Sequence, residues 1–479
     1  MSGRVFAAVD LGAASGRVMA GVVDGGEVAL HAVHRFPNGA RAVDGRLRWD
    51  FTGLYREVLT GLARLAHDFP RVESIGIDTW GVDYGLLDAD GVLLAEPVAY
   101  RDGRAAAVID DVHARIGQDE LYHINGLQVL PITTVYQLVA EQRDALWSKA
   151  AHIVLLPDLL AYWLTGALRT EFTNASTTGL LDVGTGAWSA ELLARLNIPA
   201  LRLSPIEHPG AIRGHVRPDL CVRLGLRPST VVTTVGSHDT ASAVVAVPAA
   251  GRRFAYVSSG TWSLVGLERD GPLLTPAAME ANFTNEGGVD GRTCLLRNLV
   301  GLWLLQESLR AWAEAGQRDD LATLLAAAEA VPAGGPLIDV DDPAFLPPGD
   351  MPDRIAAAAR ARDGRAPRTA AETVRCILDS LAAAYAATVR RASVLVGADA
   401  DVIHIVGGGS QNAVLCRLTA AAAGLPVTAG PVEATALGNV LIQARARGAV
   451  PASLEAIRAT IARSSAIRRF EPVRTGRSP

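Results

Sequence analysis

The sequence predicts an α/β protein with two domains, each of which buries its own core. The chain has 479 residues, more than a single growing core accommodates, so two domains of about 200 to 250 residues each are expected. Apolar runs typical of buried strands alternate with helical patterns along it. Residues 5–23 and 254–267 both show a strand, a small polar turn and a second strand. This similarity indicates a duplicated domain, with a chance match of patterns as the alternative.

Composition narrows the class of protein and the kinds of partner. Hydrophobic residues make up 49% and charged residues 20% of the chain, and the formal net charge is -5. These values favour a globular protein without the basic surface that nucleic acid requires. No signal-peptide pattern and no run of about 18 apolar residues is present, so we expect a soluble cytoplasmic protein without a membrane partner. The four widely spaced cysteines are predicted to be buried free thiols: Cys221, Cys294, Cys376 and Cys416.

The first strand pattern, residues 5–9, runs into Asp10-Leu-Gly-Ala-Ala-Ser-Gly-Arg17 before the strand pattern resumes at residues 18–23. We expect a β-hairpin whose glycines, Gly12 and Gly16, let backbone N–H groups approach a phosphate. Asp10 stands at the end of the strand, where a carboxylate can hold hydrated Mg²⁺. An ordinary glycine-rich turn is the alternative.

A second strand pattern, residues 72–77, leads into Asp78-Thr-Trp-Gly-Val-Asp83. Two carboxylates and Trp80 beside a glycine suggest a sugar-sized polar pocket with one apolar wall. The alternative is that Trp80 belongs to the core and that the acids are turn residues. The charged stretch that follows, residues 97–104, suits a ligand loop or a solvated turn. Beyond it, residues 105–200 look largely helical, with residues 173–178 as a polar loop.

The centre of the chain contains the best candidate for a catalytic base, Asp239. A strand pattern at residues 231–235 is followed by a bend at Gly236 and by small residues at 240–246, which suit a helix or a close packing contact. A carboxylate at such a strand-to-helix turn projects into a cleft, here in the company of Ser237, His238 and Thr240. The alternative is that Asp239 only caps the helix, since Asp is a preferred N-cap residue.

The second half repeats the pattern of strands and turns. Residues 282–288 form a turn-rich hairpin and residues 301–309 a helix, where Asn298 suits an N-cap and Gln306 a surface amide. A long helix at residues 373–395 precedes a strand at residues 402–406 and the run Gly407-Gly-Gly-Ser-Gln-Asn412. Three consecutive glycines are costly to order and make sense where a flat ligand lies against the backbone.

These motifs, taken in order, resemble the FGGY family of carbohydrate kinases over nearly the whole chain, from Asp10 to Asn439. The motifs that carry the resemblance are the two N-terminal ones above, Tyr100-Arg-Asp102, Gly236-Ser-His-Asp-Thr-Ala-Ser242, Ser258-Ser-Gly-Thr-Trp-Ser263, Asn282-Phe-Thr-Asn-Glu-Gly287, Gly301-Leu-Trp-Leu-Leu-Gln306 and the glycine run. The resemblance implies two similar actin-like ATPase (ribonuclease H-like) domains around a central nucleotide cleft. Residues 1–245 would carry the sugar site and the catalytic base, and residues 246–479 the nucleotide site.

The resemblance also implies a role for individual residues. Asp239 matches the family's proton acceptor. The residues expected at the nucleotide are Ala13, Ala14, Ser15, Gly16 and Arg17 in a first phosphate loop, with Thr261, Gln306 and Gly408. The residues expected at the sugar are Gly81, His238, Asp239, Thr240 and Asn298.

Within the family, the resemblance is greatest to the branch that transfers the γ-phosphoryl group of ATP to the 1-hydroxyl of L-rhamnulose in L-rhamnose catabolism. ATP and Mg²⁺ are the implied cofactors. Members of that branch commonly carry Ser where this chain has Ala14, so altered nucleotide contacts are expected. The alternatives are a kinase for another ketose or polyol (L-fuculose, D-xylulose, L-ribulose), a non-catalytic sugar sensor, and an actin- or chaperone-like ATPase.

Overall fold

The computed structural model describes residues 3–317 and 319–472, which form two compact units. The first unit comprises the described parts of Met1–Ala250, Glu268–Leu295 and Ala434–Ser464. The second comprises those of Gly251–Leu267, Leu296–Glu433 and Ser465–Pro479. Two segments from the C-terminal half therefore belong to the first unit by their contacts. The domain boundary expected between residues 245 and 246 stays a prediction.

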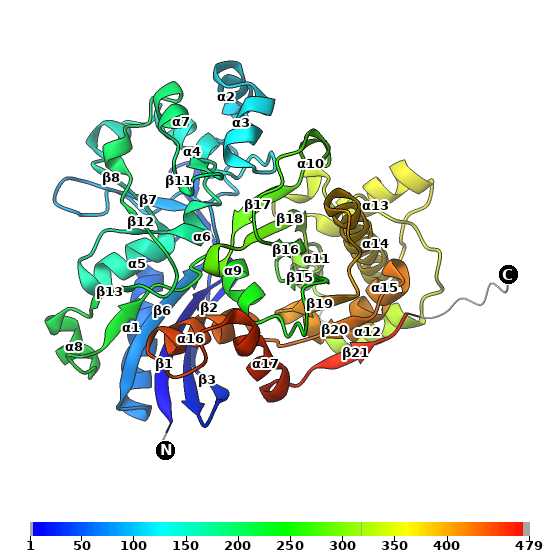
Figure 1. The fold of residues 1–479 in the computed structure, drawn as a ribbon. Coiled ribbons are helices and arrows are strands. Elements are labelled where there is room, and N and C mark those ends of the chain that lie inside the picture. Colours follow the sequence, from blue (N-terminus) through cyan, green and yellow to red (C-terminus); the bar gives the residue numbers. More distant parts are fainter. Residues whose placement is uncertain (1–2, 318, 473–479) are drawn as a thin grey trace. The chain divides into compact units, whose positions relative to one another are not determined.

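The first unit is built on a six-stranded sheet with the order β13-β14-β6-β1-β2-β3 (Figure 1). Its strands are β1 (Arg4–Leu11), β2 (Ser15–Asp24), β3 (Glu27–Pro37), β6 (Val72–Thr79), β13 (Ile212–His215) and β14 (Val231–Thr233). β1 pairs antiparallel with β2 and parallel with β6, and β6 pairs parallel with β14. The strands predicted at the start and centre of the chain are confirmed. β1 and β6 end side by side, so the residues at their carboxyl ends are neighbours.

Helices cover both faces of this sheet, as parallel strands require. α1 (Phe51–Asp68) lies on one face, where Gly61 lets its backbone come close to Val18 of β2. α16 (Ala434–Ala446) lies on the other, where Val440 occupies the space above Gly21 of β2. Alternate residues of a strand point to opposite faces, which explains why two positions three residues apart meet different helices.

A close helix crossing joins α16 to α9 (Asp239–Val245) within the first unit. A Cβ atom at Gly438 of α16 would lie 1.9 Å from the carbonyl oxygen of Ser242 in α9. Only glycine fits there, so the backbones of the two helices are in close contact. The predicted helix that follows Asp239 is confirmed.

The region predicted to be largely helical is more mixed than expected. It contains short helices and strands: α2 (Ile109–Arg115), α3 (Gln118–Asn125), α4 (Thr134–Glu141), β8 (His152–Leu155), α5 (Leu156–Thr165), β9 (Thr170–Glu171), α6 (Phe172–Ala175), β10 (Leu181–Asp182), β11 (Ala187–Trp188) and α7 (Ala190–Arg195). β8 pairs antiparallel with β7 (Tyr84–Leu87). The predicted polar loop at residues 173–178 is wrong in its first half, where residues 173–175 belong to α6, which Glu171 caps. Residues 176–178 form a turn, and the whole segment is buried.

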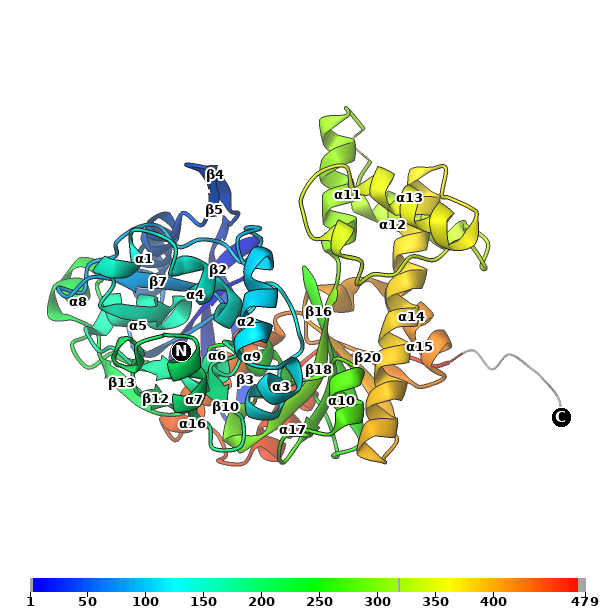
Figure 2. The ribbon, with the colours of Figure 1, turned by 90° about the horizontal axis from the view of Figure 1, so that it is seen from above.

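The second unit holds most of a seven-stranded sheet with the order β17-β18-β16-β15-β19-β20-β21. These strands are β15 (Phe254–Ser259), β16 (Trp262–Arg269), β17 (Thr284–Gly287), β18 (Thr293–Val300), β19 (Val402–Val406), β20 (Val427–Ala429) and β21 (Arg468–Phe470). Around the long α14 (Ala370–Val396), the helices α11 (Trp303–Glu314), α12 (Leu321–Ala330) and α13 (Met351–Asp363) gather at one end (Figure 2). α15 (Ala413–Ala423) packs elsewhere on α14.

The two sheets share one arrangement of strands. In each, a first strand pairs antiparallel with the next strand of its hairpin and parallel with a later strand: β1 with β2 and β6, and β15 with β16 and β19. A further parallel strand and an antiparallel edge strand follow on the same side, β14 and β13 in one sheet, β20 and β21 in the other. The predicted duplication is thus a duplication of topology.

Two smaller observations concern the cysteines and the helices. All four cysteines are buried free thiols, as predicted. None of the helices within residues 3–317 and 319–472 combines the length and the apolar character needed to cross a membrane.

Candidate active site

Three carboxylates gather in the first unit where strands of the central sheet end. Asp10 near the end of β1 stands opposite Asp78 near the end of β6 in the parallel register. His238 forms a bridge with Thr79, the last residue of β6, and so brings the start of α9 and Asp239 to the same edge. The carboxyl ends of parallel strands are the usual place for ligands in α/β sheets.

Asp10 is paired with an arginine of the expected phosphate loop. Arg17 stands opposite Asp10 in the β1–β2 hairpin, and its Nε lies 2.9 Å from Asp10 Oδ2. Because Asp10 is buried, this guanidinium offsets part of the cost of removing the carboxylate from water.

Asp78 is completely buried and held by one side chain from α16. Asn439 Nδ2 donates a hydrogen bond of 2.5 Å to Asp78 Oδ2, while Oδ1 has no hydrogen-bond partner among the described residues. Burial, reinforced by the charges of Asp10 and Asp239, raises the pKa of Asp78 well above its usual range. A positive charge nearby would therefore stabilise the ionised form of Asp78.

Asp239 is the first residue of α9, and the N-cap position belongs to His238. Asp239 is therefore not the N-cap residue of α9, and the capping role considered for it is wrong. Asp239 Oδ1 accepts a hydrogen bond of 3.2 Å from Thr240 Oγ, and its side chain remains 31% exposed. Burial raises the pKa of Asp239, against the opposing effect of the neighbouring His238. A carboxylate that is partly exposed and has a raised pKa suits proton transfer.

The loop before Asp239 is held by Glu171, a residue that the sequence did not single out. The buried Glu171 carboxylate accepts hydrogen bonds from Ser237 N (3.0 Å) and Ser237 Oγ (2.7 Å). It also accepts from Thr173 N, Thr173 Oγ and Asn174 N at the start of α6. Thr173 Oγ in turn accepts from His238 N at 3.1 Å. One carboxylate thus fixes both the loop before Asp239 and the start of α6. The sole sequence signal was an acidic residue before a Ser/Thr/Asn-rich stretch.

Gly81 and Trp80 follow β6 but differ in environment. A Cβ atom at Gly81 would lie 2.9 Å from Thr177 Oγ, so glycine permits close approach there. Trp80 is 6% exposed, packs on Trp49 with ring centroids 4.4 Å apart, and donates from Nε1 to Asp83 Oδ2 at 2.9 Å. These contacts indicate that Trp80 is a core packing residue and not the apolar wall of a sugar pocket.

The expected phosphate loop, Ala13 to Arg17, forms the turn and start of β2. Gly12 N donates to Ser15 O at 2.9 Å, and Asn38 binds the carbonyls of Gly12 and Ala14. A Cβ atom at Gly16 would lie 2.3 Å from the ring of Phe36. Ala14 is exposed at this turn.

The other expected nucleotide residues lie in the second unit, beside the ends of β15 and β19. Thr261, in the turn after β15, donates from Oγ to Gln306 Oε1 in α11 at 3.3 Å. Gly408 follows β19, and a Cβ atom there would meet nothing within 4 Å. Asn298 also belongs to this unit, but it lies inside β18, so the N-cap role considered for it is wrong.

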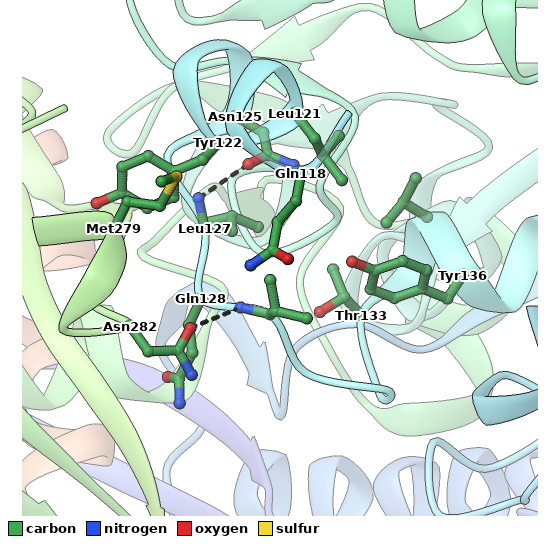
Figure 3. A pocket seen from close by; sticks show the side chains of 12 residues that line it. Gln118, Leu121, Tyr122, Asn125, Leu127, Gln128, Thr133, Tyr136, Met279 and Asn282 are labelled. Atoms are coloured by element: carbon green, nitrogen blue, oxygen red, sulfur yellow. Dashed lines mark hydrogen bonds between the residues drawn. The ribbon is translucent and has the colours of Figure 1, made fainter. Parts of the chain in front are cut away.

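The first unit also contains a small cavity (Figure 3). It has a volume of about 10 Å³, which is the space of about one water molecule. Its walls come from α3, the segment that follows α3, the start of α4, and Met279 and Asn282. None of the residues expected at the sugar or the nucleotide lines it.

Known proteins resemble this chain over nearly its whole length. The model for the N-terminal domain of the FGGY family of carbohydrate kinases matches residues 5–246, and the model for the C-terminal domain matches residues 255–447. Two curated proteins named rhamnulokinase, from Klebsiella pneumoniae strain 342 and Klebsiella pneumoniae subsp. pneumoniae strain ATCC 700721 / MGH 78578, are each 42% identical over 476 residues. Each alignment covers 98% of this chain and 95% of the relative.

Solved structures show the same fold at low sequence identity. The gluconate kinase and the ligand-bound xylulose kinase of Lactobacillus acidophilus both match with a TM-score of 0.79, at 17% and 18% identity. Each match covers 98% of this chain and 94% of the other. Together with the repeated sheet topology, they confirm the predicted α/β fold with two similar domains of the actin-like type. The chain belongs to the FGGY family of carbohydrate kinases.

Proposed function

We propose that the chain transfers the γ-phosphoryl group of ATP to the 1-hydroxyl of L-rhamnulose, giving L-rhamnulose 1-phosphate in L-rhamnose catabolism. Membership of a carbohydrate kinase family implies ATP and a sugar as substrates. The choice of L-rhamnulose rests on the relatives named rhamnulokinase, which match almost end to end. The four buried free thiols suit the reducing cytoplasm in which such a pathway would run.

Asp239 is proposed as the proton acceptor, and its position is the observation that carries the mechanism. An alcohol is a poor nucleophile at neutral pH, so a carboxylate must orient the hydroxyl and take its proton as the bond to phosphorus forms. Asp239 is the most exposed of the three gathered carboxylates, since Asp10 and Asp78 are buried. The pKa of Asp239 is raised and is therefore nearer to neutral pH than the pKa of an ordinary aspartate.

Asp10 and Asp78 are the proposed holders of Mg²⁺. Asp78 Oδ1 is a buried oxygen without a hydrogen-bond partner among the described residues, and the charges of Asp10 and Asp239 raise the pKa of Asp78. A cation at this edge would relieve that repulsion. No cluster of three or more His, Cys, Asp or Glu side chains in the described parts of the chain is arranged to hold a metal, which fits an ion that binds through few carboxylates and several waters. When bound, Mg²⁺ offsets the negative charge of the phosphates.

The remaining expected residues divide between the two substrates. Gly81, His238, Thr240 and Asn298 are proposed to contact the sugar. Ala13 to Arg17, Thr261, Gln306 and Gly408 are proposed to contact ATP, with backbone N–H groups carrying most of the phosphate loop's work despite the missing hydroxyl at Ala14.

A substrate panel tests the proposal. The purified chain is assayed with ATP and Mg²⁺ against L-rhamnulose, L-fuculose, D-xylulose, L-ribulose and glycerol, and ADP release is followed. We expect the highest kcat/KM for L-rhamnulose and a phosphate on its 1-hydroxyl by NMR. A higher kcat/KM for another acceptor would reassign the substrate, and no ADP release with any of them would leave the sugar sensor as the better reading.

A further inference from the structure

Glu286 lies in β17, within a motif that the sequence singled out without giving this residue a role. Its side chain is buried in the first unit, and its Oε2 lies 3.3 Å from Nδ1 of His238. The other ring nitrogen of His238, Nε2, lies 3.6 Å from Oδ1 of Asp239. The imidazole therefore has a carboxylate at each nitrogen, and one of the two is the proposed proton acceptor.

The charges around the ring favour its protonated form. Burial by itself disfavours the imidazolium, but the Glu286 carboxylate beside Nδ1, with the charges of Asp239 and Glu171, raises the pKa of His238. The effect is mutual, because a positive His238 opposes the rise that burial causes in the pKa of Asp239. Asp239 accepts a proton only in its ionised form.

We propose that Glu286 is a positioning residue for phosphoryl transfer: it holds the Nδ1 edge of His238, keeps the ring protonated, and so keeps Asp239 ionised as a base. This role rests on the proposed function of Asp239. Glu286 acts through His238, since its contact is with the far edge of the ring. The loop that carries His238 is fixed independently, by the bonds of Glu171 to Ser237 and of Thr173 to the backbone of His238.

A matched control stands in the same neighbourhood. Glu286 borders an open groove of about 300 Å³ that is also lined by Asp270 and Arg292. Asp270 pairs with Arg292, and its side chain is 72% exposed. Asp270→Asn therefore removes one negative charge near Glu286 without touching His238.

The direct test is the titration of His238 in the full chain. Glu286→Gln keeps the size of the side chain and removes its charge. With ¹³Cε1-labelled histidine, the His238 signal is assigned by its loss in His238→Asn. We expect its midpoint to fall by roughly one to three pH units in Glu286→Gln, as when a buried group loses an opposite charge. Asp270→Asn should leave it in place, and an unchanged midpoint in Glu286→Gln overturns the inference.

Kinetics then test the consequence for Asp239. In Glu286→Gln the acidic limb of the kcat/KM profile should move to higher pH, because a neutral His238 no longer lowers the pKa of Asp239. Removing the Glu286 charge also acts on Asp239 directly and by itself lowers the pKa of Asp239. This direct effect is the smaller one, because His238 is nearer to Asp239 than Glu286 is. KM for ATP should not change. A lowered His238 midpoint with an unmoved acidic limb overturns the catalytic part of the inference.

Two further variants separate the possible failures. If Glu286→Gln does not fold, Glu286→Ala also removes the charge and should lower the His238 midpoint in the same way; a wild-type midpoint there overturns the inference. Near wild-type turnover in Asp239→Asn would remove the proposed role of Asp239 as proton acceptor, yet the effect of Glu286 on the His238 midpoint would still stand. The two ideas therefore fail in different experiments.

Discussion

The side-chain amide of Asn439 donates a 2.5 Å hydrogen bond to Asp78, which lies 361 positions earlier in the chain. Asn439 Oδ1 in turn accepts a 2.6 Å hydrogen bond from Gln443, whose amide also reaches the carbonyl of Ala7. All four residues are buried. These two side-chain amides of α16 bond to the central strands β1 and β6. A segment near the C-terminus therefore helps to hold the Asp78 carboxylate near the N-terminus.

Asn439→Ala should destabilise the protein, because it leaves Asp78 without its donor and Gln443 without one of its acceptors. The expected cost is about 1–3 kcal/mol, the usual penalty for an unsatisfied buried polar group, measured by urea unfolding. Gly76→Ala should also destabilise, since its Cβ would lie 2.2 Å from Asn439 Oδ1. A wild-type free energy of unfolding in Asn439→Ala would show that the hydrogen bond between Asn439 and Asp78 makes no net contribution to stability.

Asp239→Asn should lower kcat by roughly 10² to 10⁴, the range for loss of a general base, with ATP affinity nearly unchanged. Asn keeps the shape of the side chain but cannot accept the proton. Steady-state kinetics with L-rhamnulose and calorimetry with ATP provide the two readouts. Thr240→Val is the matched control: it removes the hydroxyl that donates to Asp239 and should reduce kcat much less. Near wild-type turnover in Asp239→Asn would rule out the assignment.

Gly408→Val should weaken ATP binding and leave the fold intact. A Cβ atom at Gly408 would meet no atom of the described residues within 4 Å, so the valine would enter space that the proposal gives to the nucleotide. Gly409→Val is a contrasting variant, because a Cβ there would lie 2.0 Å from Ser259 Oγ and should lower the Tm. Isothermal calorimetry and thermal unfolding separate the two effects. Unchanged ATP affinity in Gly408→Val would contradict the nucleotide assignment.

The buried Asp83 predicts a pH dependence of stability. Burial raises the pKa of Asp83 to about 6, although Trp80, Trp49, Gln137 and the backbone N–H of Tyr100 all donate to it. The folded state therefore binds the Asp83 proton more tightly than the unfolded state, whose pKa is near 3.8. This contribution is fully present below pH 3.8 and is lost as the pH rises towards 6.

Asp83→Asn removes this titration and tests the sign. Relative to wild type, the variant should gain stability as the pH rises from 4 to 7, by up to about 3 kcal/mol for a shift of about two pH units. Urea unfolding of both proteins across this range gives the difference. Parallel stability curves would mean that Asp83 is already ionised at pH 4 in the folded protein.

The local sequence pattern was sufficient to predict the strands and the turn that carry the site residues. β1, β6, β14 and β19 are short apolar runs that end in glycine or acidic residues, and this signal is contained in each segment alone. The same holds for the strand-to-helix turn that presents Asp239. Where local pattern allowed two roles, as for the cap at Asn298 or the wall at Trp80, the structure decided, because the pairing of β18 and the packing of Trp80 on Trp49 involve residues distant in the sequence.

The sequence by itself determined the α/β class, the repeated strand–turn–strand openings, the family and Asp239 as the candidate base. Only the tertiary structure showed that Glu171 fixes the loop before His238, that Glu286 faces its ring, and that Asn439 holds Asp78. The physical reason is that a strand or turn follows from contacts a few residues apart. A hydrogen bond between strand ends depends instead on sheet order and register, which bring together residues that share no local pattern.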